Sequence, residues 1–79
     1  MSYRPFVDKL VRSVVESPDE LEIEEEVEDG TRTFYVRVAP NDVGKVIGKS
    51  GRVVTAIRCV VSAVAAKSRE KAFVKVVPE

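Results

Sequence analysis

Apolar residues near the start of the chain recur at intervals of three and four, which is the spacing of one helix face. The residues on that face are Phe6, Val7, Leu10, Val11, Val14 and Val15. Pro5 suits the first turn of a helix, and Ser17 precedes Pro18, where helical conformation is disfavoured. The pattern therefore predicts a helix over residues 5–17 with one buried face.

The next segment alternates apolar and polar residues with a period of two, which is typical of strands with one buried face. The apolar positions are Leu21, Ile23 and Val27 in the first run, interrupted by Glu25, and Phe34, Val36 and Val38 in the second. Asp29-Gly30 lies between the runs, and glycine tolerates the positive φ of a tight turn. Residues 21–27 and 31–39 are predicted to form a hairpin whose acidic face is solvated.

The remaining sequence predicts two helices and a strand. Residues 43–47 form a short helix that ends at Gly48, with Asn41 or Asp42 as its N-cap. A longer helix follows, and its buried stripe comprises Val53, Val54, Ile57, Val60, Val61 and Val64. Residues 72–77 have β-forming composition and predict a final strand. We therefore expect one α+β domain over residues 1–79, with the order α-β-β-α-α-β.

The composition excludes several classes of function. The 79 residues contain no histidine and one cysteine, Cys59. These counts exclude catalysis by Ser-His or Cys-His pairs, a disulfide within the chain and a zinc site. No apolar run approaches the roughly 20 residues of a membrane span, and residues 1–10 are too polar for a signal peptide. We expect a cytoplasmic, non-enzymatic protein with no cofactor, no membrane contact and no small-molecule substrate.

The formal net charge is zero, but the charges are segregated along the chain. Residues 1–40 carry five basic and ten acidic side chains, whereas residues 41–79 carry eight basic and three acidic ones. Between Val43 and Arg69 there is no acidic residue. Such segregation favours a face that binds a polyanion. Mutual neutralisation of the two halves within the fold explains the pattern equally well.

Gly48-Lys49-Ser50-Gly51 joins the two predicted helices by a very short connection. Glycine at both ends allows a sharp turn and the close approach of another backbone. The N–H groups that open the second helix lack partners and lie at the positive end of its dipole, so a phosphate can accept from them. Lys49 adds a mobile charge, and Arg52 adds a fork suited to phosphate. The structural alternative is that Gly48 caps one helix and Gly51 turns the chain.

A nucleotide-binding P-loop is excluded by the spacing of the same segment. Residues 44–50 read G-K-V-I-G-K-S, with three residues between the outer glycines. A P-loop requires four residues there, and a nucleotide-binding domain does not fit in a chain of this length. We therefore reject a nucleotide hydrolase.

Residues 46–57 read V-I-G-K-S-G-R-V-V-T-A-I. This segment resembles the KH-domain signature V-I-G-x-x-G-x-x-I-x-x-I, with Val54 in place of the first isoleucine after the loop. The order of elements resembles the type II, prokaryotic arrangement over nearly the whole chain. More narrowly, residues 17–20 and 38–49 resemble the small single-domain bacterial KH proteins of the KhpA (YlqC) family. The resemblance implies a three-stranded mixed sheet with three helices on one face.

The resemblance also implies a binding site, because KH domains clamp the backbone of about four single-stranded nucleotides with the glycine loop. The residues implied to hold phosphates are Gly48, Lys49, Ser50 and Gly51, with support from Lys45 and Arg52. Val46, Ile47 and Val54 are candidates for the floor of an apolar groove that receives the bases. Part of this apolar set must belong to the core instead, and the sequence does not divide it.

In function, the resemblance implies a non-catalytic single-stranded RNA-binding protein of the RNA-chaperone or post-transcriptional type, linked to cell shape. It implies pairing with itself or with a larger KH protein of the KhpB (Jag) type. Two alternatives stay open. One is a KH-fold protein-interaction module, against which the basic Lys49 argues. The other is a ribosome-assembly factor whose loop meets structured ribosomal RNA.

The long helix carries a second pattern on the side opposite Ile57. Small residues recur there at helical spacing: Thr55, Cys59, Ser62 and Ala66. A solvated helix face normally carries lysine and glutamate, so this stripe predicts a helix packed closely against it. That helix belongs either to a second copy in a homodimer or to residues 5–17 of the same chain.

Overall fold

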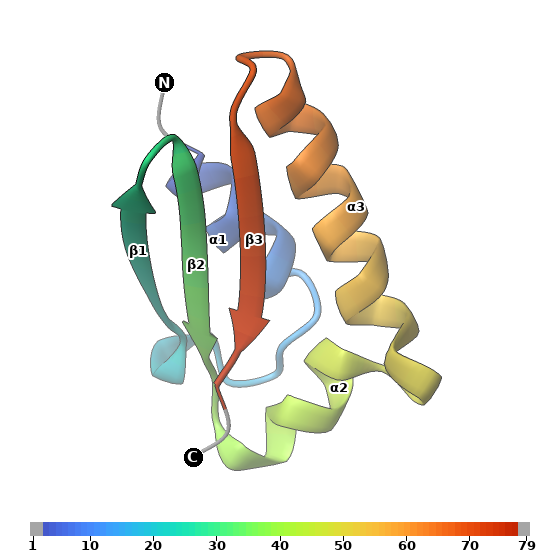
Figure 1. The fold of residues 1–79 in the computed structure, drawn as a ribbon. Coiled ribbons are helices and arrows are strands. Elements are labelled where there is room, and N and C mark those ends of the chain that lie inside the picture. Colours follow the sequence, from blue (N-terminus) through green and yellow to red (C-terminus); the bar gives the residue numbers. More distant parts are fainter. Residues whose placement is uncertain (1–2, 78–79) are drawn as a thin grey trace.

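The computed structural model describes residues 3–77 and confirms the predicted α-β-β-α-α-β order. The bounds are α1 (Arg4–Arg12), β1 (Glu22–Glu28), β2 (Thr31–Arg37), α2 (Val43–Ile47), α3 (Arg52–Ala66) and β3 (Lys71–Val76). Short 3-10 turns occupy Pro18–Glu20, Pro40–Asp42 and Lys49–Gly51. Figure 1 shows the three strands side by side, with α1 behind them and α3 running beside β3. The α+β class and the helical layer on one face of the sheet are as predicted.

The sheet has the order β1-β2-β3 and is mixed. β1 and β2 are antiparallel and are joined at Asp29 and Gly30, whose φ angles of 49° and 75° suit a two-residue hairpin turn. β2 and β3 are parallel, because α2 and α3 form the crossover between them. The register places Phe34 opposite Val74, so that both side chains enter the same core.

The hydrophobic core lies between this face of the sheet and the helices. Its buried members are Tyr3, Val7, Val11, Leu21, Ile23, Phe34, Val36, Val38, Val46, Ile57, Val61, Ala65, Ala72 and Val74. Two valines expected in the core are exposed: Val27 is 57% exposed and Val60 is 43% exposed. Val27 is the register partner of Arg32 on β2. The ion pairs of Arg32 make this end of the helix-covered side of the sheet polar. Val60 is two residues from both Arg58 and Ser62, so it projects from roughly the opposite side of α3 to these two side chains, which contact β3.

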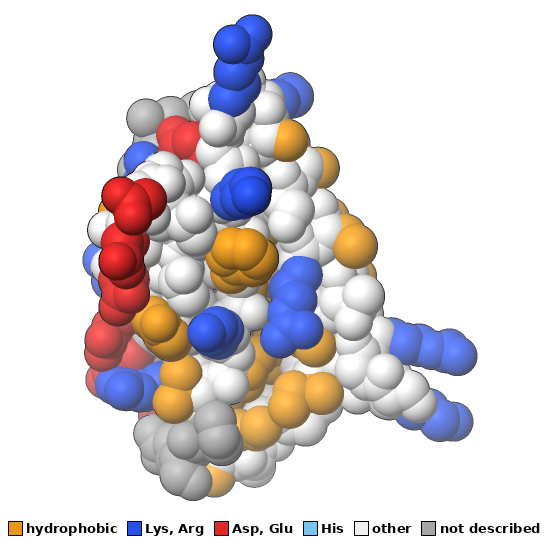
Figure 2. All heavy atoms as spheres, viewed as in Figure 1, with side chains coloured by type: hydrophobic (Ala, Val, Ile, Leu, Met, Phe, Trp, Pro, Cys, Tyr) orange, Lys and Arg blue, Asp and Glu red, His pale blue; other side chains and the backbone are white. Residues whose placement is uncertain are grey.

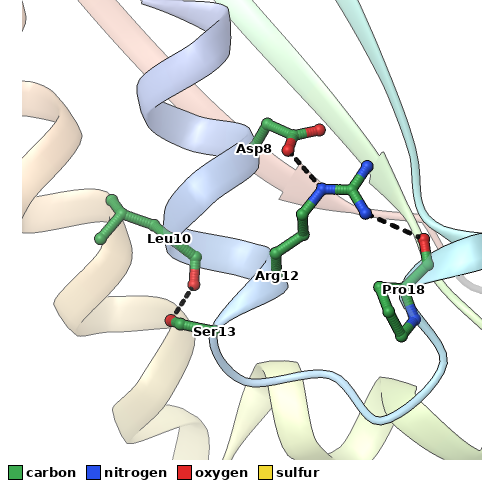
Figure 3. Close-up of polar contacts among 5 residues, drawn as sticks. All are labelled: Asp8, Leu10, Arg12, Ser13 and Pro18. Atoms are coloured by element: carbon green, nitrogen blue, oxygen red, sulfur yellow. Dashed lines mark hydrogen bonds and ion pairs between the residues drawn. The ribbon is translucent and has the colours of Figure 1, made fainter.

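The prediction for the first helix was too long, because α1 ends at Arg12 rather than at residue 17. Figure 3 shows the polar contacts at this end. The Arg12 guanidinium donates to Asp8 Oδ1 at 2.6 Å and to the carbonyl oxygen of Pro18 at 3.3 Å. Ser13 Oγ donates to the carbonyl oxygen of Leu10 at 2.6 Å. These side chains satisfy backbone groups that a continued helix would have satisfied.

A buried carboxylate accounts for the path of the chain after α1. Asp42 is fully buried, and it accepts the backbone N–H groups of Glu16 at 3.1 Å and Ser17 at 2.9 Å. Residues 16 and 17 must leave helical geometry to point their N–H groups at it. The side chain therefore ties α1 to α2, and it makes no capping hydrogen bond to α2, contrary to the expected N-cap role.

The other end of the sheet is held by an ion-pair cluster centred on Arg32. Its guanidinium binds Glu25 at 2.7 Å and Glu70 at 2.6 Å, and it lies 5.3 Å from the centroid of the Tyr3 ring. The hydrogen bond from Arg32 lowers the pKa of Glu70 below its ordinary value of 4.5. The cluster joins β1 and β2 to the residue that precedes α1 and the residue that precedes β3.

Candidate nucleic-acid interface

The turn between α2 and α3 has positive φ at three of its four residues. Gly48 has φ 78° and ψ 172°, Ser50 has φ 57°, and Gly51 has φ 73°. A Cβ atom at Gly48 would lie 2.4 Å from Val53 Cγ2 and 2.8 Å from the Val53 backbone nitrogen. Gly48 is therefore required both by its dihedral angles, which only glycine adopts readily, and by the approach of α3.

The second glycine is required for a different reason. A Cβ atom at Gly51 would have no neighbour within 4 Å, so only its left-handed conformation favours glycine. The turn is closed by the Gly51 N–H, which donates to the carbonyl oxygen of Gly48 at 3.1 Å. Lys49 and Ser50 lie at its apex and are exposed. The geometry of the turn therefore requires both glycines. The same geometry exposes the side chains of Lys49 and Ser50 to solvent.

The start of α3 faces the same turn. This helix begins at Arg52, has no acidic residue in its first turn and, within the described chain, has no side-chain cap. The Arg52 N–H donates to the carbonyl oxygen of Lys49, and no side chain caps the N–H groups that follow it at the positive end of this 15-residue helix. An anion placed at the apex of the turn would receive these donors.

Three basic side chains surround the turn, and they differ in their partners. Lys49 and Arg52 are exposed, and within residues 3–77 neither forms an ion pair. Lys45 instead lies 2.9 Å from Glu16 Oε2 and 3.8 Å from Asp42 Oδ1. Figure 2 shows basic side chains projecting from the end where α2 meets α3, far from the acidic row along β1. Two of the three predicted cations are therefore free to bind a ligand.

The structure divides the three apolar residues that the sequence could not divide. Val46 is 1% exposed and belongs to the core, and Val54 is 7% exposed. Ile47 is 37% exposed and lies at the surface next to Gly48. Of the three proposed groove residues, Ile47 is therefore the one that presents a substantial apolar surface to solvent.

β3 lies at the edge of the sheet, and two polar side chains of α3 donate hydrogen bonds to carbonyl groups on the unpaired edge of this strand. Arg58 Nε donates to the carbonyl oxygen of Val74 at 3.0 Å, and Ser62 Oγ donates to that of Ala72 at 3.4 Å. Arg58 therefore places a positive charge between α3 and β3. Sequence reasoning missed it, because only the parallel pairing of β3 places this strand beside α3.

The stripe of small residues on α3 is exposed along its whole length. Its members, Thr55, Cys59, Ser62 and Ala66, are all solvent-accessible. The alternative that the first helix of the same chain covers this stripe is therefore wrong. A shallow hollow of about 560 Å³ lies here, lined by Thr55, Arg58, Cys59, Ser62 and Ala63. Over residues 3–77 no group of metal-ligating side chains gathers, and no helix is long and apolar enough to cross a membrane.

Comparison with known families agrees with this geometry. The family model described as KhpA/KhpB, KH domain, matches residues 4–76. The chain belongs to the KhpA/KhpB family of KH domains. This family is one of KH domains and not of enzymes, in agreement with the predicted non-catalytic protein.

Several curated relatives from this family carry the name RNA-binding protein KhpA. The relative from Clostridium acetobutylicum is 35% identical over 74 residues, which cover 94% of this chain and 99% of the relative. That from Oceanobacillus iheyensis is 42% identical over 60 residues, covering 76% and 80% respectively. That from Chlamydia trachomatis is 32% identical over 76 residues, covering 96% and 97%.

A solved structure shares the fold of this KhpA/KhpB-family chain. It is the crystal structure of Era in complex with MgGDPNP and nucleotides 1506-1542 of 16S ribosomal RNA. The TM-score is 0.51 and the sequence identity is 21%, and the match covers all of this chain but 33% of the Era chain. The likeness supports the KH architecture and carries no more than that.

Proposed function

We propose that this protein is a non-catalytic single-stranded RNA-binding protein that clamps the RNA backbone at the turn between α2 and α3. The observation that carries the proposal is the convergence of three features at Gly48–Gly51: an exposed apex, a start of α3 without a side-chain cap, and two cations that form no ion pair within residues 3–77. Its family relatives are named as RNA-binding proteins, which supports the same conclusion.

The chemistry of the clamp follows from the donors present. One phosphate accepts N–H groups that follow Arg52 in the first turn of α3, where the helix dipole favours negative charge. Lys49 acts as a point charge on a flexible stem, whereas the guanidinium of Arg52 can donate two parallel hydrogen bonds to one phosphate. Lys45 contributes less, because its ammonium group is already engaged by Glu16.

The bases would lie beside the clamp, over Ile47 and next to the guanidinium group of Arg58. KH domains hold about four nucleotides in this way, and unstacked bases are read by their edges. Because the donors at the turn bind the phosphate backbone, they add affinity without distinguishing one base from another. The proposed role is that of a cytoplasmic RNA chaperone or post-transcriptional regulator.

The exposed stripe on α3 favours a protein partner as well. Small side chains allow close helix packing, and a domain of this size gains stability from association. We propose a homodimer through this stripe, or a heterodimer with a KhpB-type chain. Sedimentation of Cys59→Arg tests the site, because a large charge at the centre of the stripe would dissociate a dimer packed there. A dimer that persists in Cys59→Arg would place the interface elsewhere.

The experiment that tests the clamp is binding of a short, labelled single-stranded RNA followed by fluorescence anisotropy. The double variant Lys49→Asp, Ser50→Asp should lose binding while circular dichroism shows an intact fold. Ser50 has φ 57°, and aspartate tolerates this left-handed conformation. Both glycines are kept, so the backbone of the turn is preserved.

The chain offers a matched control at the other end of the same helix. Lys67 and Ser68 are also an exposed lysine–serine pair, and Lys67→Asp, Ser68→Asp changes the net charge by the same amount. This control should bind RNA within about twofold of the wild type, apart from a long-range charge effect that salt screens. Equal binding by both double variants would reject the clamp.

A further inference from the structure

One aromatic side chain, Phe73, lies on the face of the sheet that the helices leave uncovered. It is 51% exposed, whereas its neighbours Ala72 and Val74 are buried on the other face. A single exposed apolar side chain requires no explanation on its own, because most protein surfaces contain some. The surroundings of Phe73 are what distinguish it.

Basic side chains surround the ring. Lys71 and Lys75 lie two residues before and after Phe73, and therefore on the same face of β3. Arg58 approaches from α3, because its Nε binds the carbonyl oxygen of Val74 at the free edge of the strand. Figure 2 shows the result as a row of basic, apolar and basic side chains over β3.

A second aromatic residue extends this surface onto the middle strand. Tyr35 on β2 is the register partner of Lys75, and Lys75 Nζ lies 5.9 Å from the centroid of the Tyr35 ring. Thr33 is the partner of Phe73, so Tyr35 lies diagonally across from Phe73 on the same face. The open face therefore has a cationic and aromatic half along β3.

The opposite half of this face is acidic and limits where a polyanion can lie. The exposed glutamates of β1 are Glu22, Glu24, Glu26 and Glu28. They lie two strands from Phe73, about 10 Å away by the usual strand spacing, which is close to the screening length at physiological salt. Glu24 is also paired with Arg37 at 3.0 Å. A nucleic acid is therefore attracted to the β3 half.

We propose that Phe73 is a stacking platform for a base beyond the nucleotides held at the turn, with Lys71 and Lys75 binding the phosphates of that extension. This inference rests on the proposed function. Arg58 lies six residues beyond Arg52, about 9 Å along α3, so basic side chains lead from the turn to the ring. RNA of about ten nucleotides would then make contacts that a four-nucleotide RNA does not make.

The test compares single-stranded uridine oligonucleotides of four and ten nucleotides. Phe73→Ala should weaken binding of the ten-nucleotide RNA by at least about fivefold, since base–aromatic stacking is worth that much by alanine substitution, and should leave the four-nucleotide RNA unchanged. Val60→Ala is the matched control, because Val60 is also exposed but lies on the far flank of α3. It should bind both RNAs as the wild type does.

A second variant gives a direct reading of stacking. The chain contains no tryptophan, so Phe73→Trp introduces a single tryptophan at the proposed platform, and its emission can be excited selectively over that of the two tyrosines. Its emission should be quenched by the ten-nucleotide RNA and not by the four-nucleotide RNA, and a Val60→Trp reporter should respond to neither. An unquenched Phe73→Trp that still binds the longer RNA would overturn the inference.

The remaining outcomes separate this inference from the clamp. If the Lys49→Asp, Ser50→Asp variant loses both RNAs while Phe73→Ala matches the wild type at both lengths, the clamp stands and the platform is rejected. If the wild type binds neither RNA, both proposals fail. If Phe73→Ala alters self-association but not RNA affinity, a second copy covers the ring and the RNA platform is overturned.

Discussion

Gly48→Ala tests whether the backbone of the turn is as constrained as the structure indicates. The dihedral angles at Gly48 lie in a region that other residues enter at a cost of about 1–3 kcal/mol. The new methyl group would also meet the Val53 backbone nitrogen at 2.8 Å, and a backbone atom cannot rotate away. Relief of such overpacking costs a further 1–3 kcal/mol or so. We expect a total loss of about 3 kcal/mol or more.

Two other glycines provide the controls for this prediction. Gly51→Ala has open space and only left-handed strain, so it should cost about 1 kcal/mol. Gly44→Ala lies within α2 with open space and should be neutral or stabilising by up to about 1 kcal/mol. Urea unfolding gives the free energy of unfolding for each variant. In a domain of this size, the melting temperature of Gly48→Ala should fall by more than about 10 °C. Equal losses for Gly48→Ala and Gly51→Ala would refute the steric argument.

Three further predictions concern the buried carboxylate, the ion-pair cluster and the clamp. Asp42→Ala leaves two N–H groups without their charged acceptor, so urea unfolding should show that the free energy of unfolding falls by at least about 2 kcal/mol. Asp19 is exposed, and Asp19→Ala should change the free energy of unfolding by less than about 0.5 kcal/mol. Glu70→Gln should lower the free energy of unfolding at neutral pH. Because Arg32 lowers the pKa of Glu70, the difference in this free energy from the wild type should persist above pH 4.5 and shrink as the pH falls through the lowered pKa. A difference that does not change with pH would contradict this. RNA affinity should fall with salt at a log–log slope near −2, for about three phosphate contacts, and a slope near zero would contradict a backbone clamp.

Most of the fold could be predicted from local patterns, because its elements obey simple periodicities. The alternation over residues 31–37, the Asp29-Gly30 turn and the stop at Gly48 each reflect constraints within a few residues. The end of α1 could not be predicted this way. The chain that follows α1 is held by Asp42, which lies 25 residues beyond Ser17 in the sequence and accepts its N–H group.

The proposed binding site was only partly predictable from the sequence for a similar reason. The spacing of Gly48 and Gly51 identified the turn, and the absence of acidic residues between Val43 and Arg69 indicated that the turn is positively charged. The helical period of a five-residue helix could not show that Val46 points into the core while the adjacent Ile47 stays exposed, because the tertiary packing of α2 decides which of its sides is covered. Nor could it place Arg58 against β3, which requires the parallel strand pairing.

The central claim, a backbone clamp at Gly48–Gly51, is tested most directly by amide chemical-shift mapping. A ¹⁵N-labelled sample would be titrated with a four-nucleotide single-stranded RNA, and with the same sequence carrying an uncharged methylphosphonate backbone. The account predicts that the largest shifts occur at the amides of residues 49–53, that smaller ones follow near Ile47 and Arg58, and that the uncharged analogue causes almost none. Shifts confined to another surface, or equal shifts with the uncharged analogue, would contradict it.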